Sequence, residues 1–120
     1  MSDKEFNLQR KRIKTHLKHW RTILGLDSWT IRFEYHETRY EDNPARQADT
    51  DGSWQYQDAT IRFFLPNIAE VDDDEVREIV VHELCHLLLD PIAHNIYRKE
   101  HEKIEFVTTQ LSRAFLRTTL

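Results

Sequence analysis

The segment IVVHELCHLLL, residues 79–89, constrains the fold more than any other part of the chain. Apolar residues flank HELCH in unbroken runs, so a helix here carries apolar side chains on all sides and must be largely interior. Asp72, with Glu75 three residues later, forms a capping-box pattern that predicts the start of this helix. Pro91 disfavours the helical conformation of the residue before it, which predicts an end near Asp90. A buried helix between these two signals is therefore expected.

Three ionisable residues, His82, Glu83 and His86, fall inside this interior helix. Residues four apart lie on one helix face, so the two histidines can present two imidazole nitrogens to one ion. Glu83 lies about 100° further round, where it would reach a water bound to that ion and act as general base. The alternative is a pair of partly buried histidines without a ligand, but a polar group buried without a partner costs about 1–3 kcal/mol. A zinc ion would satisfy both imidazoles, whereas Cys85 is expected to be a small buried filler.

A catalytic zinc site needs a third protein ligand, and the downstream candidates are His94, Glu100, His101, Glu102 and Glu105. A final helix over about residues 98–118 is predicted, with an apolar face formed by Ile104, Val107, Leu111 and Phe115. Glu105 lies nearer that face than Glu102 and is the preferred third ligand. Glu100 and His101 are closer still by angle, but both fall in the first turn, where side chains cap the helix or stay solvated. Glu102 and His101 remain the alternatives.

The remaining sequence predicts an α+β layout and one domain over residues 1–120. Apolar residues at spacings of three, four and seven predict a first helix that ends at Gly25, and alternation predicts a strand in the segment SWTIRFEY. Two weaker strands follow, and their order favours an antiparallel meander. These elements are expected over 4–24 for the helix and over 28–35, 46–56 and 59–65 for the strands. The last strand, ATIRFFL, is expected to be a sheet edge on which an extended peptide could add as another strand.

Composition limits the function classes. The chain has 120 residues, one cysteine and a net charge of −4. A lone cysteine cannot form an intramolecular disulfide, no apolar run approaches the roughly 20 residues that span a bilayer, and the N-terminus lacks the apolar segment of a signal peptide. A cytoplasmic location without membrane contact is therefore expected. Residues 1–21 hold seven Lys and Arg residues, and a solvated helix face accounts for them better than nucleic-acid binding does.

HELCH, followed 19 residues after its second histidine by Glu105 on another helix, resembles the gluzincin class of zinc metallopeptidases. The similarity is greatest to small single-domain members from bacteria and phages. Further segments resemble successive blocks of such proteins: HWRTILGLDSWTIRFEY, ATIRFFLPNI, DDDEVREIVVHELCHLLLDP and IEFVTTQLSRAF. The resemblance implies a zincin-like fold with a small antiparallel or mixed sheet. It also implies zinc held by His82, His86 and Glu105, with Glu83 as the base.

An SprT-like protein is the alternative resemblance. His101 falls at a spacing compatible with a third histidine ligand, although Glu102 stands where such proteins are expected to have a glycine. Larger gluzincins often have an acidic residue four positions after the ligand glutamate, and Thr109 stands there in this chain. His94, Tyr97 and His101 are candidates by type for a group that stabilises the transition state.

Two classes of function compete. The motif and the resemblance predict a zinc-dependent metallopeptidase that hydrolyses a peptide or protein substrate through a zinc-bound water activated by Glu83. The competing class is a binding module of a phage or bacterial assembly, in which zinc only stabilises the fold. Glu83 separates them, because a structural zinc site has no use for a base and fills its four positions with protein ligands.

Overall fold

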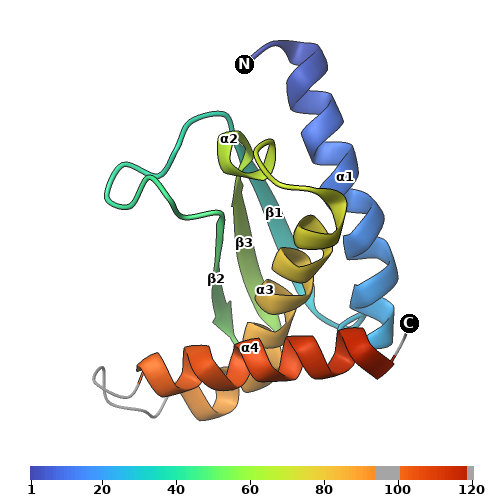
Figure 1. Cartoon of the computed structure of the whole chain (residues 1–120). Coiled ribbons are helices and arrows are strands. Elements are labelled where there is room, and N and C mark those ends of the chain that lie inside the picture. Colours follow the sequence, from blue (N-terminus) through green and yellow to red (C-terminus); the bar gives the residue numbers. More distant parts are fainter. Residues whose placement is uncertain (94–100, 119–120) are drawn as a thin grey trace.

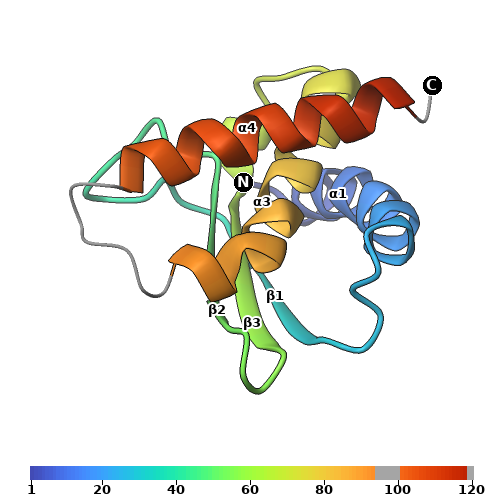
Figure 2. The same ribbon diagram turned by 90° about the horizontal axis from the view of Figure 1, so that it is seen from below.

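Helix α3 (Asp73–Ala93) runs through the interior of the molecule, as its apolar sequence requires, and its residues Val76, Val80, Val81 and Leu84 are fully buried. The computed structural model describes residues 1–93 and 101–118, except for the side chains of Ala93, His101 and Thr118. The other elements are α1 (Asp3–Ile23), β1 (Thr30–His36), β2 (Ala48–Ser53), β3 (Asp58–Phe64), α2 (Leu65–Ile68) and α4 (His101–Thr118). Helix α1 and strand β2 lie on opposite sides of α3 in both views (Figures 1 and 2). The predicted α+β class is confirmed.

The sheet is mixed, with strand order β1-β3-β2. Strand β3 pairs in parallel with β1 and antiparallel with β2. The predicted antiparallel meander is therefore wrong, because β3 inserts between its two predecessors. The apolar β3 has every second side chain buried, whereas β2 carries Asp49, Asp51 and Gly52, which suit an edge better than a centre.

Strand β2 is the edge strand that lies beside α3. Segment 59–65 cannot be the open edge that the sequence predicted, because β3 is paired on both sides. In the part of the chain that the structure describes, β2 pairs with β3 alone. Gly52 allows the close approach of β2 to α3, since a β-carbon there would lie 3.1 Å from Cδ2 of Leu87. The open edge of the sheet is thus held against the helix that carries HELCH.

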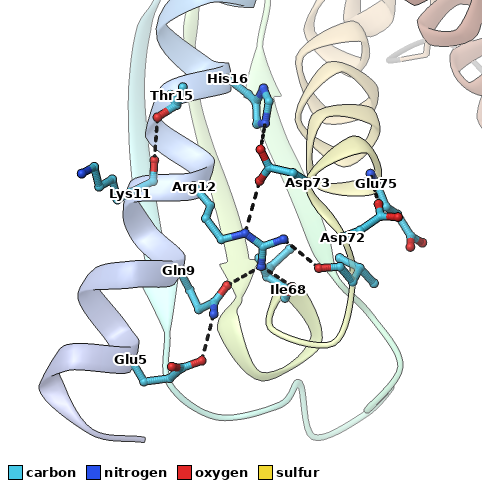
Figure 3. Close-up of polar contacts among 11 residues, drawn as sticks. Glu5, Gln9, Lys11, Arg12, Thr15, His16, Ile68, Asp72, Asp73 and Glu75 are labelled. Carbon is cyan, nitrogen blue, oxygen red and sulfur yellow. Dashed lines mark hydrogen bonds and ion pairs between the residues drawn. The ribbon is translucent and has the colours of Figure 1, made fainter.

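Helix α1 confirms the predicted first helix and ends at Ile23, two residues before Gly25, whose φ of 71° favours glycine. Its apolar face packs on α3, and one polar group fixes its position (Figure 3). The Arg12 guanidinium donates to Gln9 Oε1 at 2.7 Å, to the Val71 carbonyl at 2.7 Å and to the Ile68 carbonyl at 3.2 Å. It also pairs with Asp73 at 3.3 Å. This group, here called the Arg12 cluster, joins α1 to the chain that leads into α3.

The sequence predicted the start of α3 correctly but not its end. At its start, Asp72 Oδ1 accepts from the Glu75 backbone N–H at 2.9 Å, as one half of the predicted capping box (Figure 3). At its other end, the helix continues through Pro91 to Ala93, so the predicted end near Asp90 is wrong. A proline in the last turn removes a single helical hydrogen bond, at an end where side chains are exposed.

Helix α4 crosses α3 (Figure 2), and Leu111 and Phe115 of its predicted apolar face pack against the core. The buried face nevertheless differs from the predicted one at Val107. Thr108 and Ser112 are buried there, while Val107, expected on the apolar face, is 41% exposed. The two buried hydroxyls donate to backbone carbonyls of α4 itself, at 2.7 Å and 2.9 Å. Small side chains with satisfied hydroxyl groups therefore form the contact between the helices. None of the described helices is both long and apolar enough to cross a membrane.

Candidate metal centre

Helix α3 presents both predicted histidines on the side that faces α4. His82 and His86 lie one turn apart with ring centroids separated by 4.9 Å. Each side chain is 22% exposed, because the helix is buried around them but open on this side. The spacing of four residues thus places the two rings next to each other, as the sequence predicted.

Glu105 on α4 reaches across to both histidines. Its Oε2 lies 3.0 Å from Nε2 of His82, and its Oε1 lies 2.9 Å from Nε2 of His86. One donor atom from each of the three side chains lies within 4.8 Å of the other two. We call His82, His86 and Glu105 the His–Glu trio. The side chains predicted as ligands therefore meet at one point, although they come from two helices.

The charges of the trio are strongly coupled. Hydrogen bonds with His82 and His86 hold the pKa of Glu105 far below its usual range, against a smaller effect of burial. Burial alone would lower the pKa of His86, but the hydrogen bond with Glu105 and the nearby carboxylates raise it overall. The carboxylate therefore stays ionised between two imidazoles, which is the charge state that a cation needs.

The donor set of the trio fits a zinc ion. Two imidazole nitrogens and one carboxylate oxygen are ligands that zinc takes in catalytic sites, where a fourth position stays open. The trio is also accessible, since the Glu105 side chain is 58% exposed. Among the side chains that the structure describes, no other set of three His, Cys, Asp or Glu residues converges in this way.

Glu83 is separate from the trio and lies deeper. Only 6% of the residue is exposed, and burial raises the pKa of its carboxyl group, while the neighbouring histidines oppose that shift. Thr50 on β2 donates its hydroxyl to Glu83 Oε1 at 2.8 Å. Thr50 was not predicted as a site residue, because only the pairing of β2 beside α3 brings it to this position. A strand side chain therefore orients the predicted base.

A cleft of about 990 Å³ opens over the trio. Its walls are β2 with the loop before it, the exposed side of α3 and one side of α4. The loop wall is anchored by buried Asn67, whose side-chain amide donates to the carbonyls of Pro44 at 2.8 Å and Arg46 at 2.6 Å. A cleft beside an open strand edge can hold an extended chain.

The other predicted site residues divide into two groups. Glu102 is exposed and does not join the trio, and Cys85 is fully buried, with its pKa raised to about 11 by burial. Cys85 is thus the buried filler that the sequence predicted. The remaining candidates lie outside the described side chains: His94, Tyr97, Glu100 and His101.

Comparison with known families decides the relationship. The SprT-like family matches residues 6–110, a span that includes the trio, Glu83 and Thr50. The chain belongs to the SprT-like family. SprT-like proteins are related to the zincin-like metallopeptidases, so the predicted relation to zincins is confirmed at that level. The narrower gluzincin assignment stays a prediction. No curated protein and no solved structure matches the chain significantly.

Membership in the SprT-like family bears on the third ligand. The sequence offered His101 for an SprT-like protein and Glu105 for a gluzincin. In this SprT-like chain the carboxylate of Glu105 lies at the two histidines, while the side chain of His101 is outside the described part. The two assignments therefore call for a direct comparison by mutation.

Proposed function

We propose that this SprT-like protein is a zinc-dependent metallopeptidase. His82, His86 and Glu105 would hold the ion, and Glu83 would be the general base. The observation that carries the proposal is the meeting of two imidazoles and a carboxylate in an open cleft, with a second, buried carboxylate beside them. A zinc-stabilised binding module is less well supported, because structural sites use four protein ligands and no separate base.

The residues divide the chemical work as follows. A bound zinc ion supplies Lewis acidity at the scissile carbonyl. Glu83 would accept the proton of the attacking water, and burial of its carboxyl group raises its pKa in the metal-free protein. Thr50 fixes the direction of that carboxylate by its hydrogen bond of 2.8 Å.

Strand β2 would bind the substrate. Its outer edge has no partner strand among residues 1–93 and 101–118, and it borders the cleft that contains the trio. An extended peptide can add to such an edge through backbone hydrogen bonds, which are largely independent of sequence. This assignment replaces the predicted edge at residues 59–65.

Metal analysis tests the ligands. After reconstitution with zinc and removal of excess ion, elemental mass spectrometry should find about one zinc per chain, the occupancy of a catalytic site. Glu105→Gln should lose it, whereas Glu102→Gln, the matched control on the same helix, should keep it. His101→Asn should also keep zinc. Loss in His101→Asn alone would assign the third ligand to His101, and no zinc in the native chain would overturn the proposal.

Activity tests the base. The reconstituted protein should cleave an unstructured protein such as casein, and Glu83→Gln should not, although it retains zinc. Equal cleavage by the native protein and Glu83→Gln would remove Glu83 from the mechanism.

A further inference from the structure

The cleft over the His–Glu trio is lined by an excess of carboxylates. Apart from Glu83 and the trio, its charged lining residues are Asp49, Asp51, Glu75, Glu78 and Asp90 against Arg46 and Arg113. We propose that the cleft selects peptide segments that carry lysine or arginine two to three residues from the scissile bond. This inference rests on the proposed peptidase function and names its substrate class.

The two arginines of the cleft are already engaged. Arg46 pairs with Asp49 at 3.1 Å and stacks over the Tyr40 ring at 4.5 Å, which holds it against the loop. Arg113 pairs with Glu78 at 3.4 Å across the helix crossing. Each guanidinium therefore already has a carboxylate partner, and the cleft retains an excess of carboxylates.

Glu75 and Asp51 carry the uncompensated charge. Both side chains are exposed, and neither forms an ion pair with any residue that the structure describes. Glu75 contributes only its backbone N–H to the cap of α3, so its carboxylate is available (Figure 3). Glu78 is shared with Arg113 in a pair whose members are about half exposed, and such pairs exchange partners at little cost.

The positions on α3 give the distance to the scissile bond. Glu78 and Glu75 lie four and seven residues before His82, on the side of α3 that lines the cleft. At 1.5 Å per residue these positions are roughly 6 and 10 Å along the helix from the histidine. An extended substrate advances about 3.3 Å per residue. A cationic side chain two or three residues from the scissile bond would therefore meet this pair of carboxylates.

Helix α1 provides a contrast that makes the charge of the cleft distinctive. Lys4, Lys11, Lys14 and Lys18 lie on its exposed face, and α1 is on the side of α3 away from β2 (Figure 1). These four lysines thus lie away from the cleft. A cationic peptide is attracted to the carboxylates of the cleft, where the charges can also orient it.

Paired peptides test the proposal. A series of otherwise neutral peptides carries one lysine or one glutamate, moved from three residues before the scissile bond to three residues after it. On one side of the bond, lysine should raise kcat/KM about three- to tenfold over glutamate, the effect of one or two exposed ion pairs. The preference should shrink at high salt because these charges are exposed to solvent.

Variants connect the preference to its residues. Glu75→Gln keeps the capping-box pattern and should remove most of the lysine preference, and Glu75→Lys should invert it. Asp74→Asn is the matched control, because Asp74 neighbours Glu75 on α3 but does not line the cleft. That control should retain the native preference. Equal loss in both variants would overturn the assignment to Glu75.

Binding separates this proposal from the peptidase function. The same peptides are titrated by fluorescence anisotropy against zinc-loaded Glu83→Gln, which cannot turn them over if Glu83 is the base. Cleavage without charge preference would overturn the cationic substrate class and leave the peptidase function intact. No cleavage by the native protein, together with Glu75-dependent binding of the lysine peptides, would overturn the peptidase function and leave the cationic site. Absence of both would overturn both proposals.

Discussion

Two polar groups lie along α3, and they differ in whether their hydrogen-bond donors and acceptors are matched. In the Arg12 cluster near its N-terminus, guanidinium donors meet carbonyl and carboxylate acceptors, with bonds of 2.7 to 3.3 Å to Gln9, Ile68, Val71 and Asp73. In the His–Glu trio, two imidazole nitrogens meet one carboxylate. Neutral imidazole Nε2 atoms with free lone pairs and an ionised carboxylate are all acceptors, so they approach one another only with protons or a cation between them.

This difference separates a structural group from a ligand site. Donors and acceptors match in the Arg12 cluster, so nothing further is needed to complete it and its effect is to join α1 to the start of α3. The trio is complete only with positive charge at its centre, and it lies in an open cleft. The number of polar groups is therefore a poorer guide to function than the balance of donors and acceptors. Each of the following experiments tests one side of this contrast.

Glu83→Gln should give the largest effect. Loss of a general base lowers kcat by about 10²- to 10⁴-fold. Zinc content should stay the same, because Glu83 is not a member of the trio, and the Thr50 hydroxyl can still donate to the side-chain oxygen. Parallel measurement of kcat and zinc content checks this prediction. A variant that loses zinc together with activity would place Glu83 among the ligands instead.

Arg12→Met should produce the largest loss of stability. It leaves the Val71 carbonyl without the Arg12 donor, while the Ile68 carbonyl keeps the Val71 backbone N–H at 3.3 Å. An unsatisfied buried group costs about 1–3 kcal/mol, so we expect the free energy of unfolding to fall by roughly that amount. Urea denaturation of the metal-free protein measures this difference. Lys11→Met, an exposed change on the same helix, is the control and should change little. Zinc content should be unaffected in both, since the Arg12 cluster is expected to be purely structural.

Local patterns were enough to predict the interior HELCH helix and the two histidines that share its open side. The apolar runs made α3 interior, the spacing of four paired His82 with His86, and helix angle favoured Glu105 over Glu102 as the third ligand. The first two predictions are confirmed because the relevant information lies within one helix, whereas metal binding by these residues stays a prediction. Glu105 meets the histidines only because α4 crosses α3 opposite His82 and His86. The sequence indicated this crossing only through the resemblance to zincins.

Long-range pairing explains what the sequence did not predict. The order of the strands depends on pairing between segments far apart in the chain, such as Phe33 beside Ile61, and local alternation does not encode it. For the same reason Thr50 gave no signal. In α4, apolar periodicity pointed to Val107, whereas close approach of the two helices favoured the small residues Thr108 and Ser112.

Acidity tests the donor–acceptor contrast directly. The lowered pKa of Glu105 contributes stability above the unfolded value of about 4.3, and this contribution is lost as the pH falls through the folded value. The raised pKa of His86 contributes stability below about 6.5, which is lost as the pH rises through the folded value. In the metal-free protein, the trio should therefore stabilise the fold most between about pH 4.3 and 6.5.

Zinc should show the opposite trend above that window, because it binds the imidazoles only in their neutral form. The increase in Tm on adding zinc should be small at pH 5.5 and should reach on the order of 10 °C at pH 8, if zinc is present at about 100 times its Kd. Thermal melts with zinc or with a chelator measure both trends. His86→Asn should lose the increase in Tm with zinc and the loss of stability above about pH 6.5, but should keep part of the loss at low pH, because His82 still lowers the pKa of Glu105. A zinc effect that does not depend on pH would contradict binding through the histidines.

Substitution of Thr50 gives the smallest predicted effect. Its neutral hydroxyl donates to the carboxylate of Glu83, so this contact pairs a donor with an acceptor, although it lies beside the trio. Thr50→Val preserves shape but removes the hydrogen bond to Glu83, worth about 1 kcal/mol net. We expect kcat/KM to fall about fivefold, because the base is less well oriented, and Thr50→Ser to restore most of it. Equal losses in Thr50→Val and Thr50→Ser would attribute the effect to packing of β2 on α3. A loss confined to Thr50→Val would show that the edge strand positions the base as well as the substrate.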